Sequence, residues 1–193
     1  MNTLFRSLTL AALALLPVVA SAALQNGKVQ VGMVKGTATL FDPASQQTAL
    51  ASGRVFEQGY RVETSASSTA ELILSNGSTL IINPESLVEV RTFRQVVSEL
   101  IIDGEYQKLD KEPSPSVTEI VVTRGKVIGE VRKLNPQSSY VIKTPVGVAR
   151  IRGTIYTVQY TTSGANAGKL VVGCVKGSVE ATVYAANSGP ISV

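Results

Sequence analysis

The sequence contains no histidine, no tryptophan and only one cysteine. Without histidine the chain lacks the usual general base near neutral pH, the usual activator of a nucleophile and the commonest metal ligand. Its 14 acidic residues are scattered, and no Asp-x-Asp-x-Asp run could supply several oxygen ligands to one calcium ion. These absences predict a protein that is not an enzyme and that has no metal site and no cofactor.

Two chemistries that need no histidine are also poorly supported. A pair of carboxylates can hydrolyse glycosides, but several glutamates fall at alternating positions of extended segments, where charged side chains normally face solvent; these are Glu71, Glu89, Glu119 and Glu130. The glycine-containing stretch 163–168 lacks the Lys-Ser/Thr pair and the helix start of a phosphate-binding loop. We expect it to connect two strands.

Long hydrophobic runs are absent except at the start of the chain. Arg6 precedes an apolar stretch at residues 8–20, and the small residues 20–22 follow, which is the order of a secretory signal peptide. We therefore expect a signal peptide over residues 1–22, cleaved after Ala22. The stretch is too short for a membrane span, and no later segment approaches about 20 apolar residues.

The single Cys174 cannot form an intramolecular disulfide. Its apolar neighbours, residues 170–175, predict a buried, packed side chain. An exported chain without disulfides fits a bacterial envelope better than a eukaryotic secretory route. We expect the periplasm or the cell surface of a Gram-negative-type bacterium.

Neither sign of charge is in large excess, because 18 basic and 14 acidic residues leave a net charge of only +4. The basic residues are spread along the chain rather than clustered, which argues against nucleic acid as a partner. Residues 23–193 have the length of one domain that can bury a core without disulfides.

The pattern that is present has a period of two, which is typical of β-strands. Residues 69–74 and 78–82 alternate on either side of Asn76-Gly77, a pair that suits the type I′ turn of a hairpin, and Pro84 should end the second strand. The sequence predicts an all-β single domain built from short strands and hairpins. An irregular β-roll or β-helix-like arrangement and a sandwich both fit the pattern.

Two further features bear on this domain. A polar segment at about 103–116 interrupts the strands and predicts a surface loop or a mobile excursion. A basic residue followed by glycine recurs between apolar runs, as Lys35-Gly36, Arg124-Gly125 and Lys176-Gly177. Because glycine tolerates positive φ, each copy predicts a bend at which the chain turns a corner of the sheet.

The densest motif lies at residues 140–158, where Thr144-Pro145 is followed by Arg152-Gly153-Thr154. Together with the hairpin at residues 70–80 and the closing Lys176-Gly177 unit, this motif resembles the FecR domain over residues 53–183. The resemblance implies a β-rich periplasmic relay that passes a signal from an outer-membrane siderophore transporter toward a cytoplasmic sigma factor. This chain shows a signal peptide in place of a membrane helix ahead of the domain, so it resembles a stand-alone exported member without the anti-sigma segment.

The candidate interaction residues are those of this motif, namely Thr144, Pro145, Arg150, Arg152, Gly153 and Thr154. In a structural interpretation, Arg150 and Arg152 share one strand face and one of them is held by a carboxylate or by carbonyls at a turn. Gly153 then permits a bulge or close backbone packing, and Thr154 hydrogen-bonds to that bend. In a functional interpretation, the two guanidinium groups present hydrogen-bond donors to an acidic group of a partner.

These observations predict a non-enzymatic protein-interaction or signal-relay adaptor of the bacterial envelope, with an envelope protein as partner. One mode of contact is the addition of a strand to an exposed sheet edge. A structural or assembly component of the envelope is an alternative. A glycan-binding module is another, although sugar-binding platforms usually rely on exposed aromatic rings and this chain has few.

Overall fold

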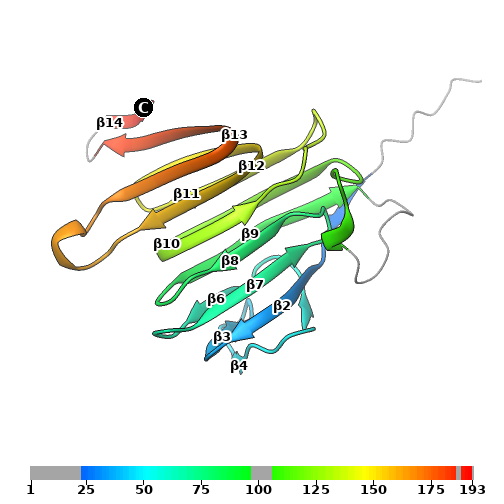
Figure 1. Cartoon of the computed structure of the whole chain (residues 1–193), viewed down its shortest axis with the longest axis horizontal. Helices are drawn as coiled ribbons and strands as arrows, with labels where there is room; N and C mark the ends of the chain where they lie inside the picture. The colour runs from blue at the N-terminus through cyan, green and yellow to red at the C-terminus, as the bar shows by residue number, and fades with distance from the viewer. Residues whose placement is uncertain (1–22, 97–105, 186–187, 193) are drawn as a thin grey trace, which may run out of the picture.

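The computed structural model describes residues 23–96, 106–185 and 188–192 (Figure 1). The predicted signal peptide and residues 103–105 of the predicted polar segment lie outside the described residues. The strands are β1 (Leu24–Asn26), β2 (Val29–Lys35), β3 (Ala38–Phe41), β4 (Gln47–Ala49), β5 (Val55–Phe56), β6 (Arg61–Thr64), β7 (Thr69–Leu74), β8 (Thr79–Ile82), β9 (Leu87–Val96), β10 (Ser116–Glu130), β11 (Ser139–Thr144), β12 (Gly147–Tyr160), β13 (Leu170–Ala185) and β14 (Ser188–Ser192).

The all-β prediction is confirmed, since one 14-stranded sheet contains every strand of the described residues. Helix is limited there to two single 3₁₀ turns, η1 (Tyr106–Lys108) and η2 (Gly164–Asn166). Neither has the length or hydrophobicity that crossing a membrane requires.

The sheet curls over itself into two layers. The first layer begins with β5, β2, β7 and β8 and continues into the second halves of β10 and β12 and the first half of β13. The second layer begins with β4, β3, β6 and β9 and continues through the first half of β10, β11, the first half of β12, the second half of β13 and β14. Figure 1 shows β13 and β14 at one end of the molecule and β3 and β4 at the other.

Long strands pass from one layer to the other at glycines with positive φ. In β10, residues 116–124 pair with β9 and residues 127–130 pair with β8, and Gly125 lies between them with a φ of 91°. In β13 the change from one layer to the other occurs at Gly177, which has a φ of 95°. Gly36, which directly follows β2, has a φ of 77°. The bends predicted at the three basic-glycine pairs are confirmed.

Each of these glycines lies against a buried hydroxyl residue that itself follows a residue with positive φ. The pairs are Gly36 with Ser68 after Ser67, Gly125 with Ser86 after Glu85, and Gly177 with Thr154 after Gly153. A Cβ atom at Gly125 would lie 2.1 Å from Ser86 Oγ, so only glycine leaves room for this contact. In the first two pairs the hydroxyl oxygen accepts a hydrogen bond from the amide that follows the glycine.

The corners form two rows at opposite ends of the strands. The first corner row contains Gly36, residues 65–68, residues 83–86 and Gly125, which hydrogen bonds connect to one another. The second corner row contains the hairpin tip 75–77, residues 131–138, Gly153 and Gly177. The chain therefore runs back and forth between two ends of a flattened roll.

Side chains that alternate along both layers point into the space between them and form one hydrophobic cluster. Leu72, Leu80, Ile120 and Ile142 are completely buried in it. Burying a side chain of this size contributes about 2 kcal/mol to the free energy of unfolding. The layers are therefore held together mainly by apolar burial.

The predicted hairpin of β7 and β8 is present, but its turn differs from the prediction. The amide of Gly77 donates to the carbonyl oxygen of Leu74, and the amide of Leu74 donates to that of Ser78. Gly77 has a φ of 85°, whereas Asn76 does not have positive φ, so the loop is a type I turn with a glycine bulge rather than type I′. Asn76 is also buried. Its side-chain amide donates a hydrogen bond to Ser116 Oγ at 3.1 Å, which satisfies this buried polar group.

The described part of the predicted polar loop, residues 106–115, exposes Gln107, Lys108, Asp110 and Lys111 on the surface but also packs in part against the sheet. Tyr106, Glu112 and Ser114 are buried. The amide of Glu112 donates to the carbonyl oxygen of Lys133 at 3.2 Å, which attaches the loop to the second corner row. Composition alone suggested exposure because it does not reveal these polar partners.

Candidate interaction surface

The first two predicted site residues lie in the turn between β11 and β12. Thr144 is buried, and its hydroxyl donates to the carbonyl oxygen of Gly147 at 3.1 Å. Pro145 is exposed at the tip of the turn. Thr144 therefore stabilises the turn, because its hydroxyl satisfies a backbone acceptor.

Arg150 and Arg152 lie on the same outward face of β12, with buried Ile151 between them pointing into the core. Arg150 Nη1 lies 3.7 Å from Glu180 Oε1 on the neighbouring strand. Among the described residues, Arg152 has no ion pair. The geometry of the structural interpretation is therefore present for Arg150, while Arg152 keeps its guanidinium group available.

Gly153 and Thr154 form the corner of β12. Gly153 has a φ of 60°, and the register with β13 shifts between Arg152 and Ile155, which is a bulge. A Cβ atom at Gly177 would lie 2.9 Å from the carbonyl oxygen of Gly153, so the two glycines permit close approach of the backbones. Buried Thr154 donates to the carbonyl oxygen of Ile155 at 3.1 Å.

The structure separates the predicted residues into two groups. Thr144 and Pro145 lie where β12 begins, whereas Arg152, Gly153 and Thr154 lie at its corner. The six residue steps from Gly147 to Gly153 span about 20 Å of extended strand. The two halves of the motif therefore cannot act together on one small ligand.

Arg152 and Gly153 line a recess of about 480 Å³ in the second corner row. Its other walls are Lys176 of β13 and the segment that joins β10 to β11, including Lys133, Asn135 and Ser138. We call this site the basic recess, because Lys133, Arg152 and Lys176 are its charged residues. Three separate segments each contribute one cation.

A buried carboxylate holds the outer wall of the basic recess in place. Glu112 Oε2 accepts hydrogen bonds from the amide of Asn135 at 2.7 Å and from Ser138 Oγ at 2.6 Å. Its other oxygen accepts a hydrogen bond from Ser116 Oγ at the start of β10. Glu112 therefore fixes the loop that carries Asn135 and Ser138 to the body of the domain.

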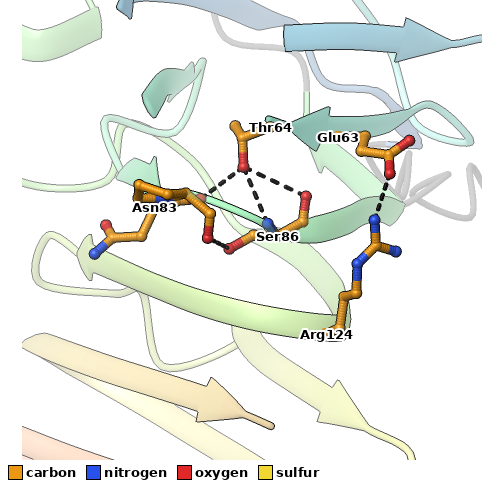
Figure 2. Close-up of polar contacts among 6 residues, drawn as sticks. Glu63, Thr64, Asn83, Ser86 and Arg124 are labelled. Atoms are coloured by element: carbon orange, nitrogen blue, oxygen red, sulfur yellow. Dashed lines mark hydrogen bonds and ion pairs between the residues drawn. The ribbon is translucent and has the colours of Figure 1, made fainter. Parts of the chain in front are cut away.

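The corner at Gly125 also borders a recess, of about 430 Å³ and lined by Arg124, Gly125 and Lys126, but here the arginine of the basic-glycine pair has a counter-charge. Figure 2 shows Thr64 between Asn83 and Ser86, and its hydroxyl donates to the carbonyl oxygen of Asn83 at 2.6 Å. The amide of Ser86 donates to Thr64 Oγ1 at 3.1 Å. In the same view Arg124 forms an ion pair with Glu63, so this cation is neutralised within the fold.

A second exposed feature is the outer edge of β13. Residues 170–181 of β13 pair with β12 on one side only, because β14 pairs with residues 182–185. Val175 is 80% exposed and Val171 is 43% exposed. We call residues 170–181 the open edge, since their outward backbone groups have no strand partner in the described part of the chain.

Cys174 belongs to this open edge, and the prediction that it is buried is wrong. Its side chain is exposed, and its sulfur lies 3.1 Å from Thr154 Oγ1. Of the apolar neighbours that suggested burial, Leu170 and Val172 are half-buried against the core, whereas Val171 and Val175 are exposed, because β13 lies near the end of the sheet.

Two residues of the basic recess were missed in the sequence. Lys176 was noticed as part of a bend, but the sequence did not show that no carboxylate in the described part of the chain pairs with it. Nothing in the sequence indicated that Lys133 lies near Gly153, because only the path of the β10–β11 loop brings the two together. A Cβ atom added at Gly153 would lie 3.4 Å from Lys133 Cα. In the described ranges, no group of three histidine, cysteine or acidic residues is arranged to hold a metal ion.

Comparisons with known proteins point to one family. The family model described as "FecR protein" matches residues 60–180. A comparison with curated proteins finds no match. Among solved structures, a chain from Parabacteroides distasonis that is provisionally described as an anti-sigma factor matches with 12% identity and a TM-score of 0.38, covering 69% of this chain and 58% of that chain. A likeness at that TM-score supports no structural inference.

Proposed function

Because this chain belongs to the FecR protein family, as the resemblance of its motifs predicted, we propose that it is a non-enzymatic adaptor that relays a signal through protein contacts in the bacterial envelope. The signal-relay role in general follows from the family. We further propose that this chain acts as an adaptor, that it is exported to the periplasm or cell surface, and that its partner is an envelope protein.

The observation that carries this proposal is the open edge of β13. Strand edges present regularly spaced amide and carbonyl groups that can pair with a strand of another protein. Natural sheets usually protect such edges with short strands, charges or covering segments. Here the open edge extends over residues 170–181 and includes the exposed Val171 and Val175. Such an edge suits the docking of a partner strand.

The same surface favours a protein partner over a glycan. Sugar-binding platforms generally use exposed aromatic rings, and in the described part of the chain Tyr184, at 40% exposure, is the exposed aromatic side chain. Its position on β13 places it next to the open edge rather than in a groove of its own.

Site-specific photo-crosslinking in cells that naturally produce the protein tests this role. A photoreactive residue at position 175 should form covalent adducts with one or a few envelope proteins. The matched control is position 81, because Ile81 is also exposed, at 42%, but lies on β8 within the sheet. Crosslinking at 175 and not at 81 is the expected result.

A charge on the edge provides the complementary measurement. Val175→Lys should reduce capture of the same partner, because a lysine side chain disfavours strand addition at an edge, whereas Ile81→Lys should leave capture unchanged. If adducts formed only between two copies of the chain, the result would indicate a structural or assembly component instead of an adaptor. Equal crosslinking at both positions would contradict the role of the open edge.

A further inference from the structure

We propose that the basic recess binds a phosphate-class oxyanion, either free or as a phosphomonoester group. The three cationic side chains that define it are Lys133, Arg152 and Lys176, and they come from the β10–β11 loop, β12 and β13. This proposal does not rest on the proposed adaptor role, although Lys176 also belongs to the open edge.

The basic recess has no counter-charge of its own. Elsewhere in the described residues, six basic side chains form ion pairs with carboxylates, namely Lys28, Arg91, Arg124, Arg132, Lys143 and Arg150. In the part of the chain that the structure describes, Lys133, Arg152 and Lys176 form none. Cations that line one recess repel one another, and an anion bound among them offsets that repulsion.

The carboxylates near the basic recess already have other partners. Glu180 pairs with Arg150 and Glu130 pairs with Arg132. Glu112 lies behind the wall of the recess, with its oxygens bonded to Asn135, Ser138 and Ser116. These acidic groups are thus directed at other donors, and the recess retains a net positive charge.

The shape of the basic recess also leaves room for an anion. The corner at Gly153 removes a side chain from the recess, because the glycine has a φ of 60° and an added Cβ would lie against the backbone of Lys133. The remaining volume of about 480 Å³ exceeds that of a single phosphate and can admit a larger phosphorylated group. Asn135 and Ser138 line the same space, but the Ser138 hydroxyl already donates to Glu112, so the three cations are the groups that would hold an anion.

The chemistry of the donors favours phosphate over a single carboxylate. A guanidinium group offers two parallel N–H donors, and lysine ammonium groups act as point charges that suit phosphate oxygens. Three cations also match a dianion better than a monoanion. Arg152 therefore supplies the directional contact, and Lys133 and Lys176 neutralise the remaining charge.

Isothermal titration calorimetry of the full chain at pH 7.5 and low salt tests the proposal, with inorganic phosphate and pyrophosphate as probes. We expect saturable binding with one site per chain. Arg152→Gln and Lys176→Gln should each weaken binding by about tenfold, because each removes a charge-assisted contact. All these side chains are exposed, so the variants should keep the circular dichroism spectrum and thermal midpoint of the parent.

The matched control is Lys169→Gln, which removes the same charge from an exposed site outside the recess. It should change the affinity by less than about twofold, because distant exposed charges are screened. An equal loss in the Lys169 variant would overturn the proposal, since the affinity would then reflect net charge alone. No binding of either probe, or binding of a glutamate-rich peptide without binding of phosphate or pyrophosphate, would also overturn it.

Vesicle flotation distinguishes the two sources of the phosphate group. Flotation with vesicles that contain phosphatidic acid, abolished by Lys176→Gln and retained by Lys169→Gln, would support a lipid phosphomonoester as the ligand. Calorimetric binding of phosphate or pyrophosphate without flotation would support a free anion.

Discussion

At the scale of single residues, two tyrosines link the layers inside the core. Tyr140 of β11 and Tyr156 of β12 are buried, and their hydroxyl oxygens lie 3.2 Å apart. Burial raises the pKa of Tyr140 to about 12, and burial together with the neighbouring Tyr140 raises the pKa of Tyr156 well above its ordinary value. Both groups are therefore kept neutral by the fold.

This burial predicts a loss of stability in alkali. In the unfolded chain both tyrosines ionise near pH 10, whereas in the folded protein they stay protonated to higher pH. The unfolded state therefore binds fewer protons above pH 10, and the free energy of unfolding should fall by about 1.4 kcal/mol per pH unit for each tyrosine. Urea denaturation at several pH values between 9 and about 12 measures this slope.

The double variant Tyr140→Phe/Tyr156→Phe isolates the contribution of these two groups. It should flatten the alkaline slope, because removing both hydroxyls also removes both ionisable groups while leaving neither oxygen unpaired. Tyr184→Phe changes a tyrosine on the exposed part of β13 and should leave the slope as it is. A double variant with the parent slope would refute the role of the buried pair.

Residue roles were only partly predictable from the sequence. The bulge at Gly153 followed from the conformational freedom of glycine, which is a local property. By contrast, the different surroundings of Arg150 and Arg152 depend on where Glu180 of the neighbouring strand lies. The exposure of Cys174 likewise depends on how far the core extends, which local hydrophobicity does not reveal.

At the scale of elements, the corner of β10 should tolerate no side chain at Gly125. A Cβ there would lie 2.1 Å from Ser86 Oγ and 2.5 Å from Ser86 Cα, at a φ of 91°. Gly125→Ala should lower the free energy of unfolding by at least about 3 kcal/mol, from backbone strain and overpacking together. Chemical denaturation monitored by circular dichroism measures this loss.

Gly168→Ala is the matched control for this prediction. Gly168 also has positive φ, at 79°, but no atom lies within 4 Å of an added Cβ. It should lose only about 1–2 kcal/mol, the strain of the left-handed conformation alone. Equal losses in the two variants would mean that the contact with Ser86 contributes nothing to the corner.

The elements show which sequence signals are local. The strands of the β7–β8 hairpin were predictable from alternation and turn residues, because both act over a few positions. Its turn type was not, because Asn76 is fixed by a hydrogen bond to Ser116, which lies 40 residues away in the sequence. The hydroxyl partners of the corner glycines were missed for the same reason.

At the scale of the whole molecule, the sequence predicted an all-β domain but not the path of its strands. The structure combines features of both arrangements that the pattern allowed, since two layers pack face to face while β10 and β11 run parallel, as in one turn of a roll. This path depends on the positions at which long strands cross between layers. Those positions are set jointly by the corner glycines and by strands distant in the sequence.

The centre of the sheet and the open edge should therefore differ in local stability. Residues 69–82 form a hairpin at the centre of the sheet, where Leu72, Leu74 and Leu80 are completely buried. No residue of 170–181 is fully buried, and this segment pairs on one side only. Because protection from hydrogen exchange follows burial and pairing, the open edge should open locally without global unfolding.

Hydrogen exchange followed by mass spectrometry measures this difference. Peptides from residues 170–181 should exchange at least about tenfold faster than peptides from residues 69–82. Residues 155–160 of β12 serve as the neighbouring control, because they pair with β10 on one side and β13 on the other and should stay protected. Equal protection of 170–181 and 155–160 would show that something covers the open edge, and exchange that slows further when the crosslinked partner is added would identify that edge as the docking site.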